Sequence, residues 1–109
     1  SAAELPEGWF DPGSVGLSER AREVATEFVY LLAVEGLLAR DARLDVIPTP
    51  IGGIQFEWAG NNGEIEVEID AQGRFYLLVE HPDGSMEESP RSDPVSAIAA
   101  LPHIRRVLA

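Results

Sequence analysis

The chain has 109 residues, 45% of them hydrophobic, which is enough for one hydrophobic core but not for two. Nineteen acidic residues against eight arginines and no lysine give a formal net charge of -11, which disfavours nucleic-acid and anionic-membrane binding and favours basic partners. Because the chain has no cysteine, a disulfide scaffold, a thiol nucleophile and a thiolate metal site are excluded.

Targeting and membrane-spanning segments have recognisable patterns, and the sequence shows neither of them. A secretory leader places charge before an apolar run, and a membrane-spanning helix needs about 20 apolar residues in succession. We therefore expect a cytoplasmic protein without a membrane partner.

Residues 1–17 are rich in proline and glycine, which disfavours a helix there. Trp9 and Phe10 are costly to leave in water, so we expect an extended arm that these aromatic side chains pin to the core. An arm that binds a partner and becomes ordered only in the complex is the alternative. Residues 18–109 are expected to form a single α+β domain.

A long amphipathic helix is predicted from Ser18 onwards. Ser18 is an N-cap candidate, and Glu19 lies in the first turn, where the helix dipole favours an acid. The apolar face comprises Ala21, Val24, Ala25, Phe28, Leu31 and Leu32. Gly36 is the candidate end, with continuation toward Arg40 as the alternative.

Further apolar residues lie outside this stripe: Val29, Tyr30 and Val34. They indicate either that the helix is covered on more than one side or that it contacts another subunit, so a homo-oligomer is possible.

Alternating patterns separated by glycine, proline and asparagine turns predict four or five antiparallel strands. Their ranges are 43–48, 54–58, 64–70, 74–80 and 85–88. The fourth is apolar on both faces, which predicts a central or partly covered strand, and the polar fifth reads as an edge strand.

A second helix is predicted to begin at Ser92-Asp93-Pro94 and to be interrupted or kinked at Pro102. The expected fold is a two-layer α+β domain, in which the long N-terminal helix packs on an antiparallel meander and a short C-terminal helix follows.

Strict acid/apolar alternation from Glu64 to Asp70 makes this segment the most distinctive in the chain. Strand geometry sends Ile65, Val67 and Ile69 to one face and the acids to the other. The outward acids are Glu64, Glu66, Glu68 and Asp70, and Glu57 joins them if Trp58 pairs with Ile65.

Like charges across neighbouring strands lower stability, so the presence of several acids on one face requires an explanation. A basic partner is one reason, and resistance to strand-on-strand aggregation is another. A hard cation such as calcium is a third, although no loop has its ligand spacing.

No pattern for catalysis, a cofactor or a metal is present. Paired acids on an open strand face lack the cleft and the separated pKa values that glycosidase chemistry requires. His81 and His103 stand apart without zinc-ligand spacing, and no Gly-x-Ser-x-Gly motif or phosphate-binding loop occurs. We predict no catalytic, cofactor-binding or metal-binding residue.

Three segments together resemble a group of small bacterial proteins to which no activity is assigned. They are the arm from Leu5 to Trp9 and on through Gly13-Ser14, the Ser18-capped helix, and the hairpin from Pro48-Thr49-Pro50 through Gly52-Gly53 to Glu57-Trp58 with the strand Glu66 to Asp70 that follows it. The resemblance covers roughly residues 5 to 80 and implies a bacterial origin and the same fold.

These observations predict a non-enzymatic module that binds a basic protein, with antitoxin- or immunity-like neutralisation as the sharpest form, by analogy with other small acidic bacterial proteins. Charge complementarity would come from Glu57, Glu64, Glu66, Glu68 and Asp70, and an apolar anchor from Trp9 and Phe10. The alternative is an inhibitor that mimics nucleic acid, of phage or mobile-element origin, and an enzyme is the third hypothesis.

Overall fold

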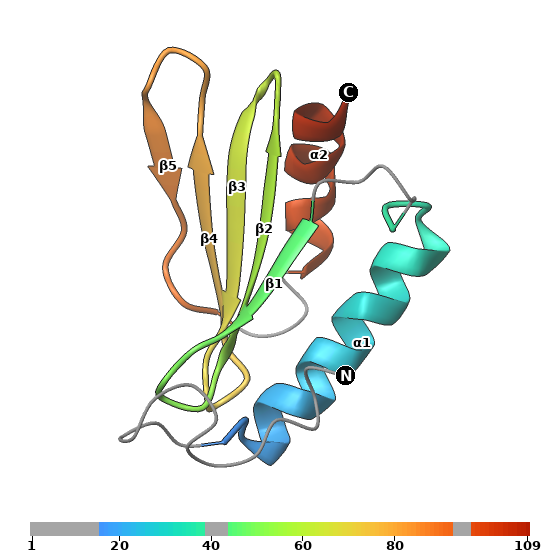
Figure 1. Ribbon diagram of the computed structural model, residues 1–109, viewed down its shortest axis with the longest axis vertical. Helices are drawn as coiled ribbons and strands as arrows, with labels where there is room; N and C mark the ends of the chain where they lie inside the picture. Colours follow the sequence, from blue (N-terminus) through green and yellow to red (C-terminus); the bar gives the residue numbers. More distant parts are fainter. Residues whose placement is uncertain (1–15, 39–43, 93–96) are drawn as a thin grey trace.

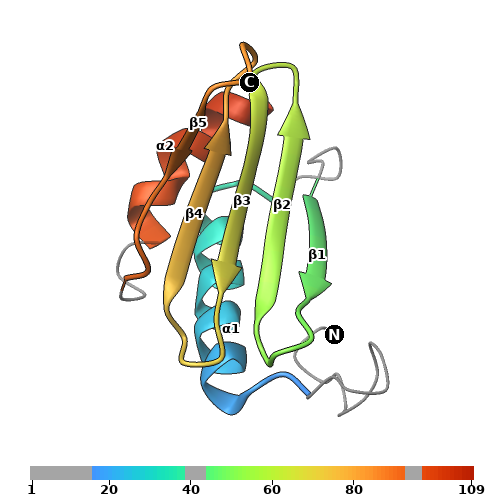
Figure 2. The ribbon, with the colours of Figure 1, turned by 90° about the vertical axis from the view of Figure 1, so that its left-hand side faces the viewer.

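The computed structural model describes residues 16–38, 44–92 and 97–109, and two helices cover one face of a sheet (Figures 1 and 2). The elements in chain order are α1 (Glu19–Val34), β1 (Leu44–Pro48), β2 (Ile54–Gly60), β3 (Gly63–Ile69), β4 (Phe75–Glu80), β5 (Met86–Glu88) and α2 (Ala97–Leu108). The predicted α+β class is confirmed. Trp9, Phe10 and the predicted helix start at Asp93-Pro94 lie outside the described residues.

The start and end of α1 follow from local sequence. Ser18 caps the helix as predicted, since its side chain accepts a hydrogen bond from the backbone N–H of Ala21. At the other end Gly36 adopts a φ of 73°, and the N–H groups of Gly36 and Leu37 donate to the carbonyls of Ala33 and Leu32. This Schellman arrangement stops the helix. With 16 residues α1 is not the long helix we expected, and it does not continue toward Arg40.

The five strands form one antiparallel meander in the order β1-β2-β3-β4-β5. Trp58 lies opposite Ile65, as predicted, and the polar β5 is an edge strand. β4 is the next strand in from that edge. The face of β4 that points away from the helices is partly covered, as the half-buried side chains of Tyr76 and Leu78 indicate.

The core lies between the helices and the apolar face of the sheet. Phe28 of α1 packs edge-on against Phe56, Trp58 and Phe75, with ring centroids 5.0, 6.3 and 5.3 Å away. Ile65, Val67 and Ile69 of β3 are all buried in this layer. The alternation in β3 therefore places its apolar residues toward the helices and its acids away from them.

α2 is one helix of 12 residues with Pro102 inside it, so the expected interruption is absent. Pro102 removes only the N–H that would bond to the carbonyl of Ile98, the second residue of α2. A Cβ on Gly60 would lie 2.2 Å from the carbonyl oxygen of Val107. Glycine at position 60 thus lets α2 pack closely on the end of β2.

Neither of the helices in the described ranges combines the length and apolar character that crossing a membrane requires.

Candidate functional site

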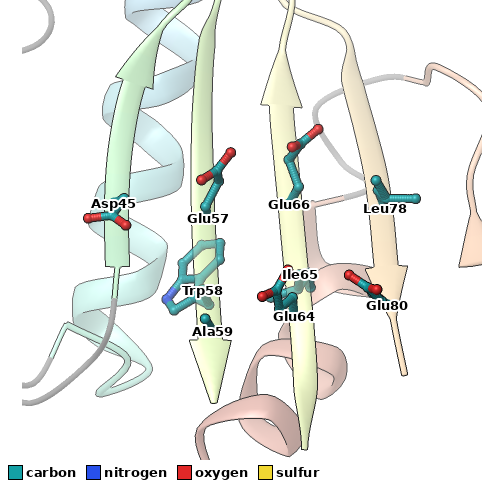
Figure 3. Close-up of a pocket in the computed structure, with 9 residues that line it drawn as sticks. All are labelled: Asp45, Glu57, Trp58, Ala59, Glu64, Ile65, Glu66, Leu78 and Glu80. Atoms are coloured by element: carbon teal, nitrogen blue, oxygen red, sulfur yellow. The ribbon is translucent and has the colours of Figure 1, made fainter. Parts of the chain in front are cut away.

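The sheet face that points away from the helices, here called the outer face, carries a row of acids across four of its five strands. Strand pairing aligns Asp45 with Glu57, Glu57 with Glu66, Glu66 with Leu78, and Leu78 with Glu88. Four of the five positions in this row are therefore acidic. Figure 3 shows its first four side chains next to one another.

A second row, closer to the β2–β3 turn, adds two more acids. Glu64 lies opposite Ala59 on one side and Glu80 on the other. The two rows border a shallow depression of about 290 Å³ (Figure 3). We call its five acids the acidic surface: Asp45, Glu57, Glu64, Glu66 and Glu80.

No residue of the acidic surface forms an ion pair with any residue that the structure describes. Partial burial raises the pKa of Glu66, and the charge of Glu57 on the neighbouring strand raises it further. The side chains of this surface are exposed or half-buried, so their carboxylates remain available to a partner.

The opposite end of the outer face is neutralised by the chain itself. Arg91, which follows β5, places its guanidinium 3.3 Å from a carboxylate oxygen of Glu68 and 3.5 Å from one of Asp70. The same guanidinium lies over the ring of Tyr76, 5.3 Å from its centroid. Glu68, predicted as a partner-binding residue, is therefore already engaged by an internal arginine.

Asp70 does not face solvent as its place in the alternation predicted, because β3 ends at Ile69 and Asp70 is only 6% exposed in the following turn. Its carboxylate accepts hydrogen bonds from the backbone N–H groups of Gln72 (3.0 Å) and Arg74 (2.9 Å) and from Arg74 Nε (2.9 Å). Burial acts to raise the pKa of Asp70, but the hydrogen bonds and charge of Arg74 outweigh it and lower that pKa. In this structure Asp70 stabilises the turn.

The structure thus brings together Glu57, Glu64 and Glu66 from the predicted set and separates Glu68 and Asp70 from them. Sequence reasoning missed Asp45 and Glu80. Asp45 lies in the predicted strand 43–48, and Glu80 ends the predicted strand 74–80. The Trp58–Ile65 pairing does not set the registers of β1 with β2 and of β3 with β4, and it is these registers that bring Asp45 and Glu80 to the other acids.

A second polar cluster lies at the helix side of the β4–β5 hairpin. His81 Nε2 is 2.8 Å from a carboxylate oxygen of Glu87, and the charges of His103 and Arg106 on α2 also act on Glu87. Within the described ranges, no group of three or more histidine, aspartate and glutamate side chains has a geometry that could hold a metal ion.

Comparison of the chain with protein-family models, with curated proteins and with solved structures finds no match.

Proposed function

We propose that the chain is a non-enzymatic module whose acidic surface binds a basic protein. The observation that carries this proposal is the alignment of five carboxylates from four adjacent strands around one depression, none of them paired with a described cation. A basic surface opposite these groups would gain both attraction on approach and specificity of orientation.

The acids at one end of the outer face are paired with an internal arginine and those at the other end are not, and this difference supports a partner. Arg91 compensates Glu68 and Asp70, whereas Glu57 and Glu66 face each other without a described cation nearby. Directly opposed like charges are destabilising. A need for solubility alone could be met by acids placed apart on the helices, where they would not repel one another across strands.

The contacts of Arg91 support arginine as the basic group that binds this face. Its guanidinium combines contact with two carboxylates and stacking on the Tyr76 ring, which are interactions that suit arginine better than lysine. Arginine-rich surfaces are therefore the preferred partners. In its sharpest form the protein neutralises a basic protein in the cytoplasm, as antitoxins and immunity proteins do.

The test is affinity capture from the native host, with three versions of the chain and quantitative mass spectrometry. The outer-face variant combines Glu57→Gln, Glu64→Gln and Glu66→Gln. The helix control combines Glu19→Gln, Glu23→Gln and Glu27→Gln, which removes the same charge from exposed positions of α1.

We expect the wild type and the helix control to capture the same basic protein and the outer-face variant to lose it. Equal capture by all three would contradict the proposal. If DNA or RNA competes for the captured protein, the function takes the nucleic-acid-mimicking form.

A further inference from the structure

We infer that the basic partner adds an extended segment to the free edge of β1, so that the partner's backbone continues the sheet beside the acidic surface. This inference rests on the proposed function and specifies how the partner is held. Strand addition is a general mode of peptide recognition, in which main-chain hydrogen bonds provide affinity and alternate side chains provide specificity.

β1 is an edge strand, and in the described part of the chain it pairs only with β2. The N–H of Thr49 donates to the carbonyl of Gly53 at 2.9 Å, so this pair is of the hydrogen-bonded type. Hydrogen-bonded and non-hydrogen-bonded pairs alternate along an antiparallel ladder. Leu44 and Val46 therefore direct their N–H and C=O groups away from β2.

The position of Pro48 agrees with this alternation. Pro48 has the same parity as Leu44 and Val46, so its missing N–H would have pointed outward and not into the ladder. Within residues 16–38, 44–92 and 97–109 nothing pairs with this edge, which thus offers two N–H groups and three carbonyls to an added strand.

The three central residues of β1 are exposed. Val46 lies on the helix-facing side, opposite buried Phe56, yet it is 41% exposed because neither helix backs β1 (Figure 2). Ile47, on the outer face, is 37% exposed. β5, the other edge, has three residues, two of them glutamates, and offers a shorter and more charged template.

Charge selects the occupant. An added strand would lie about 4.8 Å from β1, with alternate side chains next to Asp45 on the outer face and the others next to Val46. Basic residues beside Asp45 would place positive charge at the end of the acidic row that also contains Glu57 and Glu66. A second copy would instead bring its own Asp45 and a net charge of -11 to the same edge.

The partner segment is accordingly extended, of about five residues to match β1, and alternates basic with apolar side chains. The basic side chains face the outer side, and the apolar ones cover Val46.

The experiment uses two labelled peptides of identical composition and fluorescence anisotropy at physiological salt. One alternates, Arg-Val-Arg-Val-Arg-Val-Arg, and the other has four arginines followed by three valines. Val46→Pro removes an outward N–H without breaking a bond to β2, and Val46→Ala is its control, since it keeps the N–H.

We expect the wild type to bind the alternating peptide about tenfold more tightly than the block peptide. Val46→Pro should lose this preference, whereas Val46→Ala should keep most of it. If Val46→Pro does not fold, amide hydrogen exchange on the wild type replaces it, and the amides of Leu44 and Val46 should become protected when the alternating peptide binds.

The remaining outcomes separate the two proposals. Equal affinity of Val46→Pro and the wild type, together with weaker binding by the outer-face variant, would overturn strand addition and leave the acidic surface as the binding site. Equal affinity of the outer-face variant and the helix control would overturn the proposed function. If the wild type dimerises and Val46→Pro abolishes the dimer, the edge of β1 binds a second copy and the inference is overturned.

Discussion

Glu57 and Glu66 lie directly opposite each other on β2 and β3, with both carboxylates on the outer face. Burial is the main cause of the raised pKa of Glu66, and the charge of Glu57 is the next. The fold therefore holds two like charges together where either could have been replaced by a neutral polar residue. This local cost distinguishes the outer face from a surface whose acids are placed apart.

Glu66→Gln should stabilise the protein by about 0.2–1 kcal/mol at neutral pH, because it removes the repulsion from Glu57. Since its pKa is raised on folding, Glu66 binds its proton more readily in the folded than in the unfolded state, and its ionisation lowers stability as pH rises past the ordinary value of 4.5. The gain should therefore disappear below that pH. Urea unfolding at several pH values measures it. If Glu27→Gln on α1 raised the free energy of unfolding equally, the effect would be one of overall charge.

Asp70→Ala should destabilise the protein by about 1.5–3 kcal/mol, because it leaves two backbone N–H groups and Arg74 without their acceptor. The lowered pKa of Asp70 means that its contribution is present above the ordinary value of 3.8 and is lost as pH falls through the folded-state pKa. Urea unfolding of the variant and the wild type measures the difference in the free energy of unfolding. Asp83→Ala is the control, since Asp83 accepts similar bonds from Ser85 in an exposed turn and should matter less. Equal losses would show that burial of Asp70 is unimportant.

Arg91→Gln should strengthen binding of the arginine-valine peptide, because it frees Glu68 and extends the unpaired acids along the outer face. The cost in stability should be small, about 0–1 kcal/mol, since the side chain of Arg91 is substantially exposed. Fluorescence anisotropy measures the affinity. Arg20→Gln removes the same charge from α1, where Arg20 pairs with Glu23. If the two variants gained equally, the effect would be one of net charge and not of the outer face.

Glu87 should titrate below its ordinary pKa of 4.5, because His81 donates a hydrogen bond to its carboxylate and so favours the charged form. Its contribution to stability is accordingly present above that value and is lost as pH falls through the folded-state pKa. Carbon-detected NMR of the side-chain carboxyl follows this titration. His81→Ala should move the pKa back toward 4.5, and His103→Gln should move it less. A pKa that His81→Ala leaves unchanged would exclude this bond as the cause.

Local structure was largely predictable, because its causes lie within a few residues of one another. Ser18 caps α1 through a contact three residues away, and Gly36 ends it by adopting a positive φ. The alternation of Ile65, Val67 and Ile69 with acids placed them correctly inside. The errors were also local in origin: α1 has 16 residues and is not the long helix that we expected, and Pro102 does not interrupt α2.

By itself the sequence determined the antiparallel α+β architecture, the apolar and acidic faces of β3 and the strongly negative charge. Tertiary structure alone decided which acids lie together. The register across β1 to β4 adds Asp45 and Glu80 to Glu57, Glu64 and Glu66. The path of the chain after β5 brings Arg91 to Glu68, and the turn after β3 buries Asp70 against Arg74. Periodicity within a strand fixes the face on which a side chain lies, whereas its neighbours on that face depend on pairing between segments far apart in the chain.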